Sequence, residues 1–315
     1  MSRRLLAATL LCLASQASQA TNALSIFGGC GASRVECNIP SRLLIDLPLG
    51  AVLAAGDSVV STHAGSASAQ GYASFGALGA MVTATAYNSA GSASPALANN
   101  GANARMLVEF GDTLTFNALG LNGQKGTVFV NWRFDGSGGT FVGGPAPVLA
   151  QQSSMTWELS VFTPYATFTQ SKVLITNPEH PDAQSALLTP ITLAIPVVFG
   201  QPTFVHAALD IGVAASAGVP NLSPDDPGYL MTRSAGAYAN LMHTVAWDGI
   251  EQIVDAQGQA LPGWTVTSES GTNYRYAISA VPEPASAGLM LAGLWALAAG
   301  AGVKRRRESR DPPAA

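Results

Sequence analysis

Carboxylates are the most numerous titratable side chains of this chain, with 19 Asp and Glu against 15 Lys and Arg and four His. Two carboxyl groups about 5 to 10 Å apart would suffice for glycoside hydrolysis, one acting as acid and the other as base or nucleophile. The candidates for such a pair are Glu109, Glu158, Glu179 and Asp248. Solvated carboxylates on strand faces are far commoner, so we predict no catalytic residue and no enzymatic activity.

Other catalytic and metal-binding patterns are absent from the sequence. It has no Gly-x-Ser-x-Gly turn, no phosphate loop and no dinucleotide fingerprint. His206 and Asp210 would lie about 13 Å apart on one face of a strand, which does not suit a shared metal. Asp225 and Asp226 offer oxygen ligands for Ca²⁺, but two adjacent acids do not make a calcium motif. The histidines, whose spacings match no zinc motif, are His63, His180, His206 and His243. We predict no metal and no cofactor.

Aromatic side chains offer a second route to function, because they can stack on sugar rings. Most of the tryptophans fall in alternating runs, where packing in a core is the default. The residues considered are Trp132, Trp157, Trp247, Trp264 and the seven tyrosines. A carbohydrate-binding or carbohydrate-active protein is therefore the alternative to a purely structural one.

The middle of the chain is acidic. Residues 21–280 hold eight Lys and Arg against 16 Asp and Glu, a net charge of about −8, whereas the whole chain has −4. An acidic surface repels phosphate backbones, so nucleic acid is excluded as a partner. About 260 residues are enough for one large core or two smaller ones.

Alternating polar and apolar residues predict that this middle region is made of strands. The runs 103–110, 113–117 and 127–134 have period two, with turns expected at Gly111–Asp112 and at 120–123. No long stretch has helical periodicity. We therefore predict an all-β, antiparallel, β-sandwich-like body. Further strands are expected at 155–163, 166–176, 191–209, 237–247, 250–255 and 264–267, with a loop at 221–228.

Residues 61–104 have an unusual composition, since 27 of the 44 are Ala, Ser or Gly. Such small side chains argue against a dense core of their own. Because 79–87 still reads as a strand, we expect one or two thin strands separated by flexible loops. A disordered spacer is the alternative.

Two cysteines lie close together near the start of the body. Cys30 and Cys37 are separated by a short segment, and Gly28, Gly29 and Gly31 give the chain freedom to close on itself. In an exported protein this spacing predicts a disulfide. A two-cysteine metal site has no nearby histidine to complete it.

The N-terminus resembles a signal peptide, and we expect it to form a short helix. A basic start precedes the apolar stretch 5–14, and small residues follow at the spacing that signal peptidase requires. We place the cleavage after Ala20, so that the signal peptide is 1–20, with Ala17 as the alternative position. The body, residues 21–280, is then exported.

The C-terminus is a second targeting segment. The apolar run 285–303 would form a helix of roughly 28 Å, close to the thickness of a bilayer. The positive-inside bias keeps the basic residues that follow, and the short end 308–315, in the cytoplasm. These basic residues are Lys304, Arg305, Arg306 and Arg307. A buried core helix is the alternative for the apolar run.

The order of these C-terminal parts resembles the PEP-CTERM sorting signal. The tail 281–307 holds the motif 281–284, then the Gly- and Ala-rich apolar span, then the arginine cluster. The motif itself is Val281, Pro282, Glu283 and Pro284. The resemblance implies processing by exosortase, a membrane protease of Gram-negative bacteria that make exopolysaccharide. The two prolines hold the backbone extended, which is the form a protease cleft binds.

The same resemblance extends weakly into the body, through 110–115 and the segments 247–250, 255–258 and 267–274. It implies a β-rich exported domain and transfers no catalytic residue. The expected partners are signal peptidase, exosortase, the inner membrane through 285–303, and exopolysaccharide. The expected role is structural or adhesive, first at the inner membrane with the body in the periplasm, then at the cell surface or in the extracellular matrix.

Overall fold

The computed structural model describes an all-β body. The described residues are 22–32, 35–61, 65–88, 100–144, 151–176, 182–186, 190–217, 233–242 and 245–278. They belong to the first of two compact units, which ends at Ile278. Within these ranges, no helix is long and apolar enough to cross a membrane.

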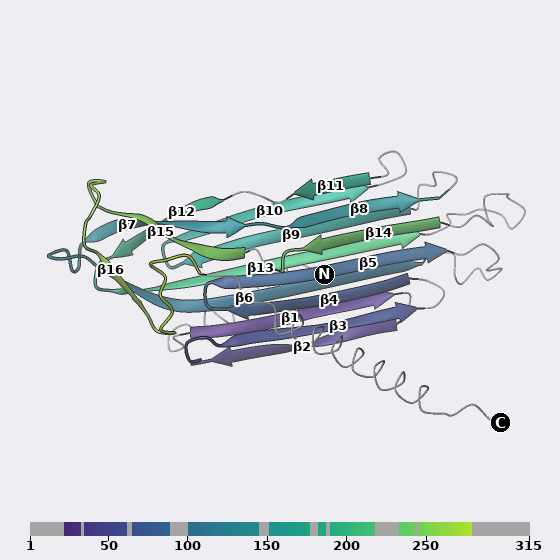
Figure 1. Cartoon of the computed structure of the whole chain (residues 1–315), viewed down its shortest axis with the longest axis horizontal. Coiled ribbons are helices and arrows are strands. Elements are labelled where there is room, and N and C mark those ends of the chain that lie inside the picture. Colours follow the sequence, from purple (N-terminus) through teal and green to yellow (C-terminus); the bar gives the residue numbers. More distant parts are fainter. Residues whose placement is uncertain are drawn as a thin grey trace, which may run out of the picture. The chain divides into compact units, whose positions relative to one another are not determined.

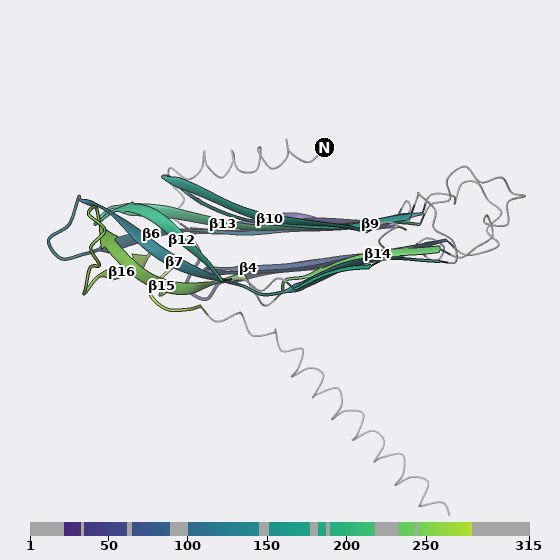
Figure 2. The same cartoon turned by 90° about the horizontal axis from the view of Figure 1, so that it is seen from above.

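Two antiparallel sheets lie face to face as separate layers (Figure 2). The first sheet has the order β10-β9-β13-β6-β1-β2, and β16 pairs with the end of β6. Its strands are β1 (Asn22–Ala32), β2 (Val35–Ile45), β6 (Gly101–Asn117), β9 (Gln151–Thr163), β10 (Ala166–Thr176), β13 (Pro202–Ala217) and β16 (Thr265–Ser268). The predicted all-β, antiparallel class is confirmed.

The second sheet has the order β11-β8-β14-β5-β15-β7-β12, with β4 joined to β5 and β3 joined to β4. Its strands run along the same long direction as those of the first sheet (Figure 1). They are β3 (Val52–Ser61), β4 (Gly65–Ser74), β5 (Ala77–Asn88), β7 (Lys125–Phe134), β8 (Ser137–Gly143), β11 (Asp182–Ala186), β12 (Ile191–Val198), β14 (Arg233–Asn240) and β15 (Val245–Asp255).

A row of aromatic rings joins the two sheets in the core. Phe110 of β6 stacks on Trp132 of β7, with 6.1 Å between ring centroids, and Trp132 meets the edge of Trp247 of β15 at 5.8 Å. The next ring in the row is Tyr274, 4.9 Å from Trp247. All four are buried, so core packing is the role of these tryptophans, as their place in alternating runs predicts.

The predicted turn at Gly111–Asp112 is wrong, because β6 runs straight through it. Gly111 is needed there for packing and not for a turn: a Cβ atom on it would lie 2.7 Å from the ring of Phe204. Two other runs that were predicted as single strands are each divided into two strands in the structure. The 191–209 run is broken at Gly200, whose φ of +76° favours glycine, and the 237–247 run divides into β14 and β15.

The Ala-rich segment contributes to the common core. It forms β4 and β5, as the strand reading of 79–87 predicts, and alternate alanines such as Ala69 and Ala84 are fully buried. The segment has no dense core of its own: its small side chains pack in the common core, where residues of the opposite sheet fill the space. A Cβ on Gly71 would lie 2.7 Å from Val108 Cγ1. Residues 89–99 of this segment lie outside the described residues.

The predicted disulfide is confirmed, but its setting differs from the expected loop. Cys30 and Cys37 are bonded and lie directly opposite each other on β1 and β2, with 5.0 Å between Cα atoms. That distance is typical of a disulfide. The strands β1, β2 and β3 were not expected from the sequence pattern.

A buried carboxylate ties the last described segment to β6. Asp112 is fully buried, and its Oδ1 accepts hydrogen bonds from Thr113 N at 2.9 Å and Ser270 N at 3.2 Å. Ser270 Oγ donates to its Oδ2. Burial raises the pKa of Asp112 above its ordinary value of 3.8, and the hydrogen bonds from Ser270 and Thr113 oppose that rise only in part.

The replacement Asp112→Asn should change how stability depends on pH. Because the folded-state pKa of Asp112 is raised, its contribution to stability is complete below 3.8 and is lost as the pH rises through the folded pKa. The Tm of the unchanged protein, relative to that of Asp112→Asn, should therefore increase as the pH falls from neutral toward 3.8. Thermal unfolding followed by circular dichroism measures this.

Asp135→Asn is the matched control, since Asp135 is exposed. Its Tm should track that of the unchanged protein across the same pH range. A constant Tm difference between the unchanged protein and Asp112→Asn would contradict the role given to burial.

Candidate functional site

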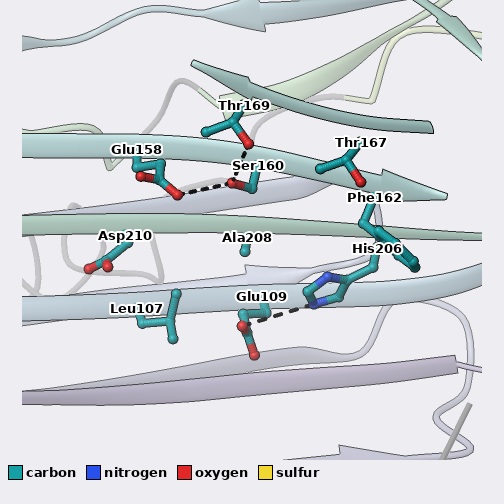
Figure 3. Close-up of a pocket in the computed structure, with 10 residues that line it drawn as sticks. All are labelled: Leu107, Glu109, Glu158, Ser160, Phe162, Thr167, Thr169, His206, Ala208 and Asp210. Carbon is teal, nitrogen blue, oxygen red and sulfur yellow. Dashed lines mark hydrogen bonds and ion pairs between the residues drawn. The ribbon is translucent and has the colours of Figure 1, made fainter. Parts of the chain in front are cut away.

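A pocket of about 370 Å³ opens on the face of the first sheet that is turned away from the second sheet (Figure 3). It crosses the four adjacent strands β6, β13, β9 and β10. Alternation directs its lining outward, because Ala207, Leu209 and Ile211 of β13 point into the core. The lining residues are Leu107, Glu109, Glu158, Ser160, Phe162, Thr167, Thr169, His206, Ala208 and Asp210.

The floor of the pocket is Ala208, a small residue between longer ones. It is in register with Glu109 of β6 on one side and with Ser160 of β9 on the other. Ser160 is in turn opposite Thr169 of β10, and their hydroxyl groups lie 3.3 Å apart. Because the side chain of Ala208 is only a methyl group, the longer side chains on both sides of it enclose a hollow.

One end of the pocket holds a buried acid and a buried imidazole. Glu109 is 3% exposed and His206 is 5% exposed. Ser25 Oγ of β1 donates a hydrogen bond to Glu109 Oε2. Glu109 Oε1 lies 3.9 Å from His206 Nε2, too far for a direct hydrogen bond. His206 Nε2 has no hydrogen-bond partner among the described residues.

The imidazole is uncharged at neutral pH. Burial lowers the pKa of His206 below its ordinary value of 6.5, and the negative charge of Glu109 opposes this only in part. Among the described residues, no Lys or Arg forms an ion pair with Glu109. The carboxylate therefore has a hydroxyl and a neutral ring as its neighbours.

The other end of the pocket holds two more carboxylates and a guanidinium beside them. Arg105 Nε donates to Asp210 Oδ1 at 2.9 Å, and Arg105 Nη2 donates to Asp210 Oδ2. The hydrogen bond to Asp210 is the main cause that raises the pKa of Arg105, while burial opposes it and the charge of Glu158 adds to it. Glu158 accepts a hydrogen bond from Ser160 Oγ at 3.2 Å. Three carboxylates thus face one cation.

This arrangement does not activate a serine nucleophile. Ser25 donates to Glu109 and not to His206, so the order hydroxyl–base–acid that such catalysis requires is not formed. The described residues also contain no group of three or more His, Cys, Asp or Glu placed to hold a metal. The pocket offers a ligand carboxylates that accept hydrogen bonds and hydroxyls that donate or accept them, and Phe162 provides an apolar surface at one end.

The structure brings together two of the four predicted carboxylate candidates. Glu109 and Glu158 line the same pocket. Glu109 lies two strands away from Ser160, and Glu158 is the preceding outward-facing residue on the strand of Ser160. Strand spacing then gives roughly 12 Å between the Cα atoms of the two glutamates. Asp248 lies elsewhere, on β15 of the second sheet, where it bridges to Ala277. Glu179 lies outside the described residues.

Several other predicted features also lie outside the described residues. They are His63, His180, His243, Asp225, Asp226, the cleavage position Ala20, the motif Val281–Pro284, the span 285–303 and the basic residues 304–307. Their roles remain predictions.

The sequence pattern missed the pocket because its residues are far apart in the chain. His206 and Asp210 do lie on one face of β13, as strand geometry predicts, but their partners are Glu109 and Arg105 on β6, about a hundred residues earlier. Alternation shows that His206 and Glu109 point out of the core. It does not show that β6 and β13 are neighbours.

The comparisons with known proteins give no relative. No family model, no curated protein and no solved structure matches this chain.

The replacement Ser25→Ala should destabilise the protein by about 1–3 kcal/mol, because it leaves a buried carboxylate oxygen of Glu109 without its donor. In a Glu109→Gln background the same replacement should cost about 1 kcal/mol or less, since no charge depends on the hydroxyl. Urea unfolding of the four proteins measures both values. Equal costs in the two backgrounds would contradict this pairing.

Ser171→Ala serves as the control, since Ser171 is an exposed serine on β10. Its effect on the free energy of unfolding should stay within about 0.5 kcal/mol.

Proposed function

We propose that this protein is an exported surface or exopolysaccharide-matrix protein with a non-enzymatic, adhesive role, and that the pocket on its first sheet holds a segment of polysaccharide. The observation that carries the binding role is the pocket itself. Its volume of about 370 Å³ lies in the range of about 300–1,000 Å³ usual for small-molecule sites.

The chemistry of the lining suits a polyhydroxylated ligand. Carboxylates accept hydrogen bonds from sugar hydroxyls, and the hydroxyls of Ser160, Thr167 and Thr169 both donate and accept. Phe162 offers a ring for apolar contact with a sugar face. These groups stand on paired strands and not on loops, so little order has to be gained on binding.

The place of action follows from the ends of the sequence. The signal peptide, the Pro-Glu-Pro motif, the apolar span and the basic stop support export, transient anchoring in the inner membrane and release by exosortase. A matrix protein of this kind would meet exopolysaccharide as the most abundant ligand around it.

A carbohydrate-active enzyme is the second candidate, and one observation favours it. Glu109 and Glu158 face the same pocket, and long side chains can shorten their separation toward the distances used in glycoside hydrolysis. Adhesion is preferred because Glu109 is held by Ser25 at the pocket wall and Glu158 by Ser160.

Binding can be tested by filling the pocket. The whole protein, purified in detergent, is mixed with the exopolysaccharide of the producing bacterium and sedimented with it. Ala208→Phe should reduce retention at least tenfold, because the new ring occupies the floor between Glu109 and Ser160. Ala214→Phe is the matched control, since Ala214 is an exposed residue of the same strand and does not line the pocket.

Retention of Ala208→Phe at the level of the unchanged protein would refute the binding role. Release of soluble sugar by the unchanged protein, lost in Glu158→Gln, would favour the enzyme.

Processing is tested separately. The double replacement of Pro282 and Pro284 by Ala should leave the protein uncut in the membrane fraction, because a helix replaces the extended backbone that a protease binds. The same double change at Pro312 and Pro313, beyond the basic stop, should leave release unchanged. Fractionation followed by immunoblotting measures both. Normal release of the first variant would refute exosortase processing.

A further inference from the structure

The pocket carries an excess of negative charge. Its lining holds the carboxylates Glu109, Glu158 and Asp210 and no Lys or Arg. Arg105, in the adjoining row of β6, forms its ion pair with Asp210. Three negative groups and one positive group therefore leave about two charges without a counter-charge among the described residues.

Glu109 is the member of this group that most needs a cation. At 3% exposure it has little contact with water, and its Oε2 is satisfied by Ser25. Its Oε1 faces the imidazole Nε2 of His206 at 3.9 Å, and among the described residues no Lys or Arg forms an ion pair with it. A buried carboxylate without a counter-charge is costly, and the cost falls when a cation binds beside it.

His206 gives an independent sign of a missing partner. Its Nε2 atom is buried, faces the Glu109 carboxylate and makes no hydrogen bond with any described residue (Figure 3). Buried polar atoms are rarely left without a partner, so such an atom in a pocket wall marks a place for a ligand group. With the ring proton on Nδ1, Nε2 is an acceptor.

The two atoms that face each other here, Glu109 Oε1 and the unpartnered His206 Nε2, are then both acceptors on one side of the pocket. A ligand group placed between them must donate to both. An ammonium group has three N–H donors, no acceptor and a positive charge, so it matches both atoms and the charge excess. A sugar hydroxyl donates only one hydrogen bond, and the carboxylate of a uronic acid would meet three like charges.

We infer that the ligand of this pocket is a polysaccharide segment containing an amino sugar with a free, protonated amine, which lies between Glu109 and His206. The inference rests on the proposed carbohydrate-binding function. The hydroxyls of Ser160, Thr167 and Thr169 then face the ring hydroxyls of the same sugar or the next one. A metal ion is a poorer fit, since the described residues provide no three-ligand cluster.

Titration calorimetry with a soluble hexamer of glucosamine tests the inference, with the fully N-acetylated hexamer as the comparison. Acetylation removes the charge and two of the three N–H donors and leaves the ring hydroxyls in place. The whole protein in detergent should bind the free amine at least tenfold more tightly than the acetylated hexamer. Because this comparison changes the ligand and not the protein, it does not depend on how a variant folds.

Glu109→Gln should weaken binding of the glucosamine hexamer at least tenfold, and Ala208→Phe should do the same. Glu251→Gln, the same change at an exposed position on the second sheet, should leave it unchanged. An equal loss in Glu251→Gln would mean general attraction of a polycation to an acidic protein, and would overturn the inference.

The two proposals fail in different ways. If the acetylated hexamer, or a hexamer of galacturonic acid, binds as tightly as glucosamine and Ala208→Phe abolishes that binding, the pocket binds sugar but the amine is refuted. If no hexamer binds and Ala208→Phe retains the exopolysaccharide normally, the carbohydrate-binding function itself is refuted.

Discussion

The register of β6 between β1 and β13 is the constraint on which both the core and the pocket depend. Met106, Val108 and Phe110 point toward the second sheet, and Arg105 and Glu109 point away from it. A slip of one residue would exchange these two sets, placing charges in the core and large apolar groups in the pocket. The aromatic row that begins at Phe110 therefore fixes the same register that positions Glu109 opposite Ala208.

The electrostatics of the outer face follow from what stands next to each acid. Asp210 has a guanidinium beside it, whereas Glu109 has a serine and a neutral imidazole. Burial keeps His206 uncharged, so it cannot serve as the counter-charge of Glu109 at neutral pH. One sheet face thus combines a satisfied ion pair with an acid that is free to take an outside donor.

Much of the fold could be predicted from the sequence, because alternation is a local property. The class and most strands from β6 onward follow from it, and the disulfide follows from the short separation of Cys30 and Cys37. The contribution of the alanine-rich strands to the core could not be predicted, because the packing of Ala69 and Ala84 depends on the opposite sheet. β1 and β2 were missed because glycines and exposed apolar residues blur their alternation. The pocket depends on which strands are neighbours, and pairing across about a hundred residues leaves no trace in a local pattern.

The segment after β16 has a mechanical consequence. It is held by Ser270 on Asp112, by the indole of Trp247 on the Tyr274 carbonyl at 2.7 Å, and by Ile278 N on Trp247 O at 2.8 Å. Tension applied to the chain beyond Ile278 would act first on the hydrogen bond at Ile278, then on the one at Tyr274 and last on the one at Ser270. The segment after β16 could then detach under load while the strand pairs within both sheets stayed intact.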